Sequence, residues 1–469
     1  MASTYPIETT LRHNLQEQLR LFAFNTSPSP SAEMATWVRA RLNKRERLAA
    51  LLESELNFHG RNSSYASHNF HAFAAKFPPQ LPRAFIRGLT DPGDVVLDPM
   101  MGSGTTVVEA LLEGRRGIGL DIDPLALRLC QVKTTPSPVS RLQVAGYRAI
   151  THAAALLSDG QAVDRALTER FDEATKEFIN YWFLPSTQRE LMALTLAIEE
   201  EADTSARRFL ELTFSSAIIT KSGGVSRARD LAHSRPHLNK EKVPKDALAQ
   251  FSLRLRKNLS GILELKANGV SAVALAGNAR FMPLASESVD LIVTSPPYAN
   301  AIDYMRAHKF SLVWFGRSVK DLAELRAGYI GSERVGRTEY AALPKRPEAI
   351  IAQLMARDPH KAAVLRKYYA EMREALSEMY RVLRSDSPAI VVVGTSVMGG
   401  IDVQTHFCLA DIAASLGFDV VGIAQRLLDR NKRMMPARFG GKAGSLIEQR
   451  MHEEHIVGLM KPALLRSSA

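Results

Sequence analysis

The segment VVLDPMMGSGTTVVEALL, residues 95–112, carries the clearest indication of the fold of this chain. Its apolar start is typical of a short buried strand, and its apolar end repeats with the spacing of a helix. Gly102 and Gly104 lie between the two, where glycine allows a tight turn and a close approach of backbone to a ligand. One of the two threonines that follow is expected to cap the helix. Because the apolar segment 117–120 predicts a second strand, the stretch opens a βαβ unit.

The alternation of strands and helices resumes far along the chain. Apolar runs predict further strands at residues 273–276, 291–293, 390–393, 420–423 and 456–459. Together with the first two, they make about seven strands with helical patterns between most of them. This order predicts an α/β fold with a doubly wound, Rossmann-like sheet.

Two segments do not follow this alternation. Residues 1–60 combine a Ser-Pro linker with helical apolar spacing, which predicts a helical N-terminal extension. Residues 134–267 are helical by pattern and too long for an ordinary loop, so they predict an insertion into the α/β domain. The insertion divides that domain into a first part, residues 61–133, and a second part, residues 268–469.

The composition limits the classes of protein that remain. The net charge is +11, which favours a polyanionic partner, with nucleic acid the first choice. Only Cys130 and Cys408 occur, which argues against a disulfide framework and fits a reducing cytosol. The N-terminus lacks the pattern of a signal peptide, and no apolar run approaches the roughly 20 residues of a membrane span. The sequence therefore predicts a soluble cytoplasmic protein without a membrane partner.

Carboxylates stand at the ends of the first two predicted strands. Asp98 can accept a hydrogen bond from an amine or another cationic group, and Asp121 is placed to accept from ribose hydroxyls. Two other classes of glycine loop are excluded by neighbouring residues. A phosphate-binding loop needs a lysine after its last glycine, and none follows Gly104. A dinucleotide-binding loop needs a third glycine where Val107 stands.

A second motif, Thr-Ser-Pro-Pro-Tyr at residues 294–298, follows the predicted strand at 291–293. The Ser295 hydroxyl and the Pro296 carbonyl are acceptors that can orient an exocyclic amine and draw its lone pair out of conjugation. Tyr298 offers a face on which an extruded base can stack. Attack on a sulfonium methyl depends on positioning more than on a strong base. The motif therefore suits methyl transfer to an amine.

Residues 98–106 and 294–298 resemble motifs I and IV of the SAM-dependent amino-methyltransferases of DNA, which form N4-methylcytosine or N6-methyladenine. The spelling S-P-P-Y is closer to the cytosine-N4 branch than to the adenine branch, where D-P-P-Y is usual. Residues 65–71 and 75–81 resemble the N-terminal motif of the family, which closes over the methionine part of SAM. The resemblance implies a methyltransferase domain with S-adenosyl-L-methionine as its cofactor.

The resemblance covers about residues 60–130 and 270–460, and it implies roles for particular side chains. The residues expected to bind SAM are Lys76, Phe77, Asp98, Pro99, Gly102, Gly104, Thr105, Asp121 and Asn278. The residues expected to hold the target base for catalysis are Ser295, Pro296, Pro297 and Tyr298. Asn278 departs from the family, which often places Asp there, and its amide is expected to accept from the adenine amino group.

Two windows of the sequence are rich in basic residues. Seven Lys and Arg face two acids between residues 221 and 245, and the same excess recurs between 426 and 450. A charge run is usually a solvated face, but two windows beside a base-modifying signature favour contacts with DNA. The residues expected to contact DNA are Lys221, Arg227, Arg229, Arg235, Lys432, Arg433, Arg438 and Lys442. The insertion is expected to read the target sequence, with a stabilising helical lid as the alternative.

The sequence thus predicts a site-specific DNA methyltransferase, closest to a cytosine-N4 enzyme, that acts on double-stranded DNA at the nucleoid. Adenine N6 in DNA, guanine N2 in RNA and a non-catalytic DNA-binding subunit remain open alternatives. Cytosine-C5 chemistry is excluded, because neither cysteine follows a proline as that nucleophile typically does. No metal site is expected, because His-Glu-Glu-His at 452–455 lacks the H-E-x-x-H spacing and predicts a charged strand edge. A cognate restriction nuclease or defence system is a further expected partner, and the oligomeric state is left open.

Overall fold

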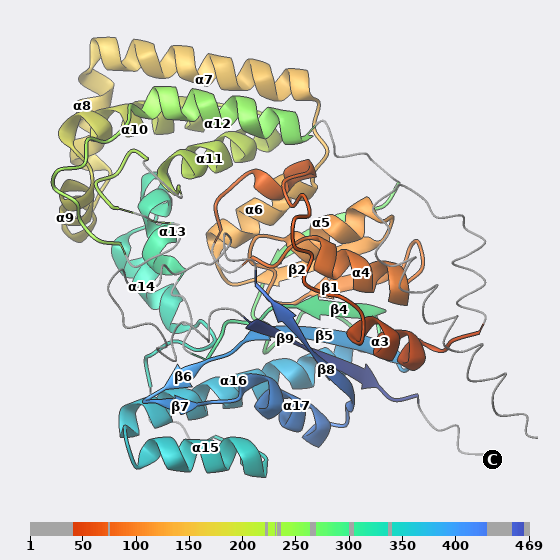
Figure 1. Cartoon of the computed structure of the whole chain (residues 1–469). Coiled ribbons are helices and arrows are strands. Elements are labelled where there is room, and N and C mark those ends of the chain that lie inside the picture. Colours follow the sequence, from red (N-terminus) through yellow and green to blue (C-terminus); the bar gives the residue numbers. More distant parts are fainter. Residues whose placement is uncertain are drawn as a thin grey trace, which may run out of the picture.

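The computed structural model describes residues 41–73, 76–220, 224–229, 231, 236–262, 269–299, 304–335, 340–428 and 453–463. Within them the largest sheet has seven strands in the order β3-β2-β1-β4-β5-β9-β8 (Figure 1). The strands are β1 (Val95–Asp98), β2 (Arg116–Asp121), β3 (Ala272–Ala276), β4 (Leu291–Thr294), β5 (Ser387–Gly394), β8 (Asp419–Leu427) and β9 (Glu453–Lys461). The first five are parallel, and β9 runs antiparallel between β5 and β8. This arrangement confirms the α/β class and the predicted strands.

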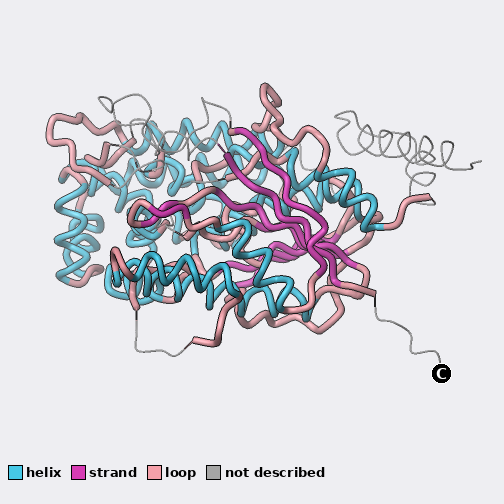
Figure 2. The backbone as a smooth tube through the Cα atoms, turned by 60° about the horizontal axis from the view of Figure 1, so that its bottom comes forward, coloured by secondary structure: helices cyan, strands magenta, loops and turns pink. Residues whose placement is uncertain are grey.

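The most apolar strands lie in the middle of the sheet because both of their faces are covered. Every residue of β1 and β4 is buried, as expected of parallel strands between two layers of helices. Successive side chains of a strand point to opposite faces, so Val96 and Leu97 belong to two different hydrophobic clusters. Figure 2 shows the strands gathered into one twisted band with helices on both sides.

Helices cover each face of the sheet. Phe85 and Ile86 pack with Val96 on one face, and Met372 and Leu376 pack with Leu97 on the other. The helices of the first face are α3 (Lys44–Leu52), α4 (Gln80–Leu89) and α5 (Thr105–Leu112). Those of the second are α15 (Lys345–Met355), α16 (Pro359–Val382) and α17 (Thr405–Ser415), drawn below the sheet in Figure 1. Helix α6 (Pro124–Thr134) follows β2 and packs beside β3.

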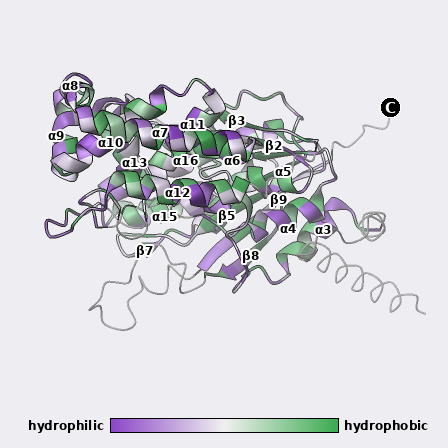
Figure 3. Ribbon diagram, turned by 90° about the horizontal axis from the view of Figure 1, so that it is seen from above, coloured by the Kyte–Doolittle hydropathy of each residue, from purple (hydrophilic) through white to green (hydrophobic). Residues whose placement is uncertain are grey.

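A separate helical layer lies between β2 and β3 in the sequence, within the predicted insertion. Its helices are α7 (Val139–Asp159), α8 (Gln161–Glu169), α9 (Glu173–Trp182), α10 (Pro185–Glu199), α11 (Thr204–Ile218) and α12 (Ala247–Ile262). They share one hydrophobic cluster that contains Leu191, Phe209 and Phe251. The outer helices α8 and α9 carry hydrophilic residues along much of their length (Figure 3). The predicted domain boundaries themselves remain predictions.

The chain after β4 joins this helical layer to the sheet. Trp314 is fully buried, and its ring meets Phe171 and Phe183 edge-on at centroid distances of 5.8 and 5.5 Å. It belongs to the segment formed by α13 (Met305–Leu312), the short 3₁₀ helix η2 (Val313–Phe315) and α14 (Val319–Ala327). The layer therefore packs against the segment α13–η2, which comes after the Ser-Pro-Pro-Tyr motif in the sequence.

The remaining elements are short or correct a prediction. The helix η1 spans Ala66–Asn69, and β6 (Val397–Met398) pairs with β7 (Ile401–Asp402). The prediction of a charged strand edge at 452–455 is wrong, because β9 starts at Glu453 and lies between β5 and β8. Among the described helices, none combines the length and the apolar character needed to cross a bilayer.

Candidate active site

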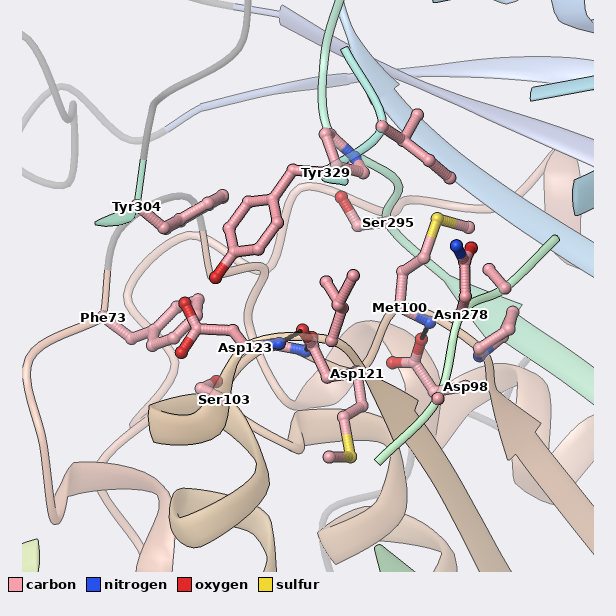
Figure 4. A pocket seen from close by; sticks show the side chains of 18 of the residues that line it. Phe73, Asp98, Met100, Ser103, Asp121, Asp123, Asn278, Ser295, Tyr304 and Tyr329 are labelled. Atoms are coloured by element: carbon pink, nitrogen blue, oxygen red, sulfur yellow. Dashed lines mark hydrogen bonds between the residues drawn. The ribbon is translucent and has the colours of Figure 1, made fainter. Parts of the chain in front are cut away.

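The carboxyl ends of the parallel strands meet at one edge of the sheet, and a cavity with about 880 Å³ of empty space opens there (Figure 4). The strand order reverses direction between β1 and β4, which is where open α/β sheets bind ligands. The residues that line the cavity are Phe73, Lys76, Phe77, Asp98, Pro99, Met100, Met101, Gly102, Ser103, Thr105, Asp121, Ile122, Asp123, Gly277, Asn278, Ala279, Ser295, Pro297, Tyr304, Gly328, Tyr329 and Ile330. The two motifs found in the sequence therefore meet in one cavity.

The glycine loop has a backbone that other residues rarely adopt. Gly102 has a φ of 47° and Gly104 a φ of 73°, both in the left-handed region. A Cβ atom on Gly102 would lie 3.1 Å from the ring of Phe73, so a side chain there would displace that ring. Gly104 is the N-cap of α5, and no side chain caps that helix. The predicted threonine cap is therefore wrong, since the Thr106 hydroxyl donates instead to the Val293 carbonyl at 3.1 Å.

A buried lysine donates a hydrogen bond to the backbone of the glycine loop. Lys133 is 2% exposed, and its Nζ donates to the carbonyl of Ser103. Burial lowers its pKa to about 8 because the charged form loses hydration. Lys133 lies in α6, the third element after the loop, and no local pattern in the sequence pointed to this contact.

Asp98 closes the end of β1 and faces the cavity. It is 2% exposed, and its Oδ1 accepts from the Thr294 hydroxyl at 2.7 Å and from the Met100 amide at 3.2 Å. Burial raises its pKa to about 6, although the bond from Thr294 opposes that shift. A cation placed beside Asp98 would stabilise the ionised form.

Asp121 closes the end of β2 and orders the glycine loop. Its Oδ2 accepts from the Gly102 amide at 2.8 Å, and its Oδ1 accepts from the Asp123 amide at 2.8 Å. Burial first, and the neighbouring Asp123 carboxylate second, raise its pKa to about 7. Asp121 thus joins the loop after β1 to the loop after β2, and each of its oxygens keeps a lone pair for a ligand.

Asn278 follows β3 and lines the cavity with a defined amide orientation. Its side-chain oxygen accepts from the amide of Arg280 at 3.1 Å and from Arg280 Nε at 3.3 Å. Both groups on Arg280 can only donate, so the atom that faces them must be the oxygen. The amide nitrogen is then the group offered to a ligand. The structure thus places a donor where the sequence analysis expected an acceptor.

The N-terminal motif contributes to the cavity through some of its residues. Phe73, Lys76 and Phe77 line it, and Lys76 Nζ donates to the His68 carbonyl at 2.6 Å. Tyr65 and His68 do not line the cavity. Their side chains belong to a buried cluster in α5 instead.

That cluster is centred on Glu109, which is fully buried one turn along α5 from the glycine loop. The hydroxyl of Tyr65 donates to it at 2.7 Å, His68 Nε2 at 2.6 Å and Arg83 Nε at 2.7 Å. Burial lowers the pKa of His68 to about 4, and the bond to Glu109 opposes that shift. The conspicuous Tyr-x-x-His pattern therefore fixes the motif to α5.

The Ser-Pro-Pro-Tyr turn leaves β4 at the edge of the cavity. Ser295 and Pro297 line it, whereas Pro296 is buried and Tyr298 is half-buried beside it. The Tyr298 hydroxyl donates to Glu454 Oε1 at 2.9 Å. Burial, and then the Glu454 carboxylate, raise the pKa of the phenol, so it stays protonated.

Several residues of the cavity were not predicted. Phe73 and Tyr304 stack with centroids 5.2 Å apart, and His308 Nδ1 donates to Asp123 Oδ2 at 2.6 Å. Tyr329 lies across the cavity from Asp121 in Figure 4. Asp123-Pro124 was a recognisable helix start, and Asp123 accepts from the first amides of α6. The aromatic residues follow no such local pattern.

The predicted DNA contacts are described only in part. Arg229 is exposed and Arg227 is half-buried, on either side of Ala228, which forms an antiparallel bridge with Leu238. Lys242 Nζ donates to the Ala228 carbonyl at 2.7 Å and supports this bridge. The other predicted contacts lie outside the described residues, namely Lys221, Arg235, Lys432, Arg433, Arg438 and Lys442.

A doubly wound sheet with a glycine loop, and with Asp98 and Asp121 beside its switch point, is the architecture expected of a SAM-dependent methyltransferase. Residues 19–132 match the family model described as DNA methylase. The type II methyltransferase M.MvaI of Kocuria varians is 22% identical over 394 residues, which cover 76% of this chain and 83% of that protein. M.BsoBI of Geobacillus stearothermophilus, also a type II methyltransferase, is 24% identical over 284 residues, 56% of each chain.

Among known structures, a SAM-dependent methyltransferase from Methanosarcina mazei has a TM-score of 0.29 and 10% identity, covering 81% of this chain and 97% of that one. A likeness at that level adds nothing to the strand order described above. Over the matched regions the chain is therefore similar to the SAM-dependent amino-methyltransferases of DNA.

Proposed function

We propose that this enzyme methylates the exocyclic N4 amine of cytosine in double-stranded DNA, after the base has left the helix. The observation that supports this most directly is that Ser295 and Pro297 line the same cavity as Asp98, Asp121 and Asn278. One cavity thus offers groups suited to SAM beside groups suited to an amine. The spelling of the motif, with Ser in place of Asp, favours cytosine over adenine.

The cavity suits SAM in charge and in backbone shape. SAM supplies an electrophilic methyl group on a positively charged sulfur. Asp98 and Asp121 have raised pKa values in the protein alone, and a cationic ligand favours their ionised forms. Gly102 and Gly104 leave space for a ligand to approach the backbone.

Three of the SAM-binding residues have distinct proposed roles. Asp98 accepts from the amino group of the methionine part, and Asp121 accepts from the ribose hydroxyls. Asn278 donates its amide N–H to a ring nitrogen of the adenine, because its oxygen is held by Arg280. The residues proposed to complete the binding site are Lys76, Phe77, Pro99, Gly102, Gly104 and Thr105.

The target amine is proposed to bind at the turn after β4. The Ser295 hydroxyl and the Pro296 carbonyl accept from its two N–H groups and hold its lone pair toward the cavity. Pro297 fixes the backbone of the turn, and Tyr298 stacks on the base. No strong base is needed, because the geometry aligns the nucleophile with a charged leaving group.

DNA is proposed to reach the cavity along the basic segments. Arg227 and Arg229 contact phosphates, together with Lys221, Arg235, Lys432, Arg433, Arg438 and Lys442, so affinity falls steeply with salt. The helical layer α7–α12 is proposed to recognise the target sequence, because it packs against the segment that follows the catalytic turn. A cognate restriction nuclease remains an expected partner without a supporting contact.

The test uses purified protein, deuterated SAM, and a mixture of unmethylated duplex DNA and tRNA, followed by mass spectrometry of the nucleosides. Labelled N4-methylcytosine from the DNA is expected. Labelled N6-methyladenine, or a labelled tRNA nucleoside, would keep the SAM chemistry and overturn the substrate. Absence of SAM binding would overturn the enzymatic function altogether.

A matched pair of variants localises the activity in the same assay. Ser295→Ala removes one proposed acceptor and is expected to lose methyl transfer while it keeps SAM affinity. Ser158→Ala removes an exposed hydroxyl that bonds only within α7, and it should behave as the wild type.

A further inference from the structure

We propose that Glu454 and Arg426 are positioning residues for methyl transfer, which act by fixing the ring of Tyr298 at the catalytic turn. The inference rests on the proposed function and adds to it two residues outside every recognised motif. Glu454 is separated from Tyr298 by 156 positions in the sequence. No local pattern links it to the site.

Arg426 and Glu454 form a buried ion pair that uses one carboxylate oxygen of Glu454. The other oxygen accepts from Tyr298. Arg426 Nε donates to Glu454 Oε2 at 2.7 Å, and their side chains are 4% and 9% exposed. The other carboxylate oxygen of Glu454 accepts from the Tyr298 hydroxyl at 2.9 Å. A buried ion pair is weak evidence for stability, since apolar residues often replace such pairs without loss. The contact with Tyr298 gives this buried pair a role other than stability.

The three contacts lie in one row across the sheet. Glu454 of β9 stands directly opposite Arg426 of β8 on one side and opposite Gly394 of β5 on the other. A Cβ atom on Gly394 would lie 2.7 Å from Cε2 of Tyr298, so only glycine leaves room for the ring. Gly394 thus bounds the ring, Glu454 holds its hydroxyl, and Arg426 holds Glu454.

The row has a direct consequence for the proposed base site. A ring that is bounded on one side and held at its hydroxyl cannot swing away when a base stacks on it. The turn after β4 contributes acceptors, while β5, β8 and β9 contribute the support for the aromatic platform. Preorganisation of this kind lowers the barrier by holding the reacting groups in place.

The test is a double-mutant cycle on the single-turnover rate of methyl transfer to duplex DNA at saturating SAM. Tyr298→Phe and Glu454→Gln are each expected to slow transfer by about tenfold to a hundredfold, the range for a hydrogen bond to a charged group. If Glu454 acts through Tyr298, the double variant is no slower than the slower single variant. Multiplicative losses in the double variant would overturn the inference.

Two variants distinguish a loss of stability from a loss of positioning of Tyr298. Tyr298→Phe removes one oxygen from a retained ring, so an unchanged rate in this variant alone would also overturn the inference. Asp290→Asn removes a similar carboxylate, which is paired with Arg384 and accepts from the Val95 amide at 2.9 Å. That pair lies at the amino end of β1 and β4, so its loss should lower thermal stability and leave the rate unchanged.

SAM affinity, measured by calorimetry, should equal that of the wild type in every folded variant of the cycle. A wild-type protein that transfers no methyl group to DNA would overturn the proposed function and this inference together. A wild type that does transfer keeps the proposed function, and the cycle alone then decides the role of Glu454.

Discussion

The hydroxyl of Thr294 donates to Oδ1 of Asp98 at 2.7 Å, and this bond joins the carboxyl ends of β4 and β1 across 196 positions of sequence. Both side chains are buried, at 0% and 2% exposure. Thr294 immediately precedes the turn proposed to hold the amine, and Asp98 immediately precedes the glycine loop. One hydrogen bond therefore couples the geometry of the two halves of the site.

Thr294→Val tests this coupling because it keeps the shape and removes the hydroxyl. Asp98 then loses a partner while buried, which costs about 1–3 kcal/mol of folding free energy and weakens SAM binding. Calorimetry with SAM and thermal unfolding measure the two effects. Thr195→Val is the control, since its equally buried hydroxyl bonds only to the Leu191 carbonyl within α10. An unchanged SAM affinity in Thr294→Val would contradict the coupling.

The affinity for SAM is expected to depend on pH. The pKa values of Asp98 and Asp121 are raised to about 6 and about 7, and a cationic ligand binds the ionised forms. Above these values both groups are already ionised, so affinity is constant. Below them ionisation must accompany binding, so affinity falls by up to about tenfold per pH unit for each group.

Calorimetric titrations of SAM between pH 5 and pH 8.5 check this dependence. Asp98→Asn should bind more weakly at high pH and show a shallower fall at low pH, because one titrating group is gone. An affinity that is flat over the whole range would show that neither carboxylate faces the cation.

Gly102→Ala tests the shape of the cofactor loop. The alanine must adopt a φ of 47°, and its Cβ would lie 3.1 Å from the Phe73 ring that lines the cavity. SAM affinity is expected to fall by at least about tenfold, because strain and a displaced ring both disturb the binding surface. Gly114→Ala has a comparable φ of 73° with open space around it, so it controls for backbone strain away from the cavity. Equal losses of affinity in both variants would contradict a local effect.

Glu109→Gln tests the anchor of the N-terminal motif. A fully buried carboxylate that accepts from three donors loses its charge, and Arg83 then keeps only Glu113, at 3.3 Å, as its counter-ion. Breaking a buried pair in this way costs about 3–5 kcal/mol, which thermal or urea unfolding would detect. Glu200→Gln alters an exposed partner of His152 and should change stability by less than about 1 kcal/mol. A Glu109→Gln variant as stable as the wild type would contradict the anchor.

The sequence predicted the parts of the molecule that follow from local patterns. Short apolar runs predicted the strands. Gly102 and Gly104 predicted a turn, which the structure places at the switch point of the sheet. Asp98 and Asp121 could be located because acids at the ends of parallel strands meet at one edge. These features depend on neighbours in the sequence or on the general geometry of α/β folds.

The parts that could not be predicted depend on contacts between distant segments. Glu454 looked like a charge on an exposed strand, and only the pairing of β9 between β5 and β8 brings it to Tyr298. Tyr65 and His68 were conspicuous in sequence, but their partner Glu109 is 44 and 41 positions away. Asn278 offers a donor because Arg280 Nε donates to its side-chain oxygen. The sequence does not show the direction of the Arg280 side chain.

The cofactor and the amine acceptors are proposed to share one cavity. The most direct measurement is a crystal structure of the protein with sinefungin, a SAM analogue in which carbon replaces the sulfur and an amine replaces the transferable methyl group. The account predicts density between Asp98, Asp121 and Asn278, with that amine directed to Ser295 and the Pro296 carbonyl. Sinefungin bound elsewhere, or bound with its amine turned away from Ser295, would contradict it.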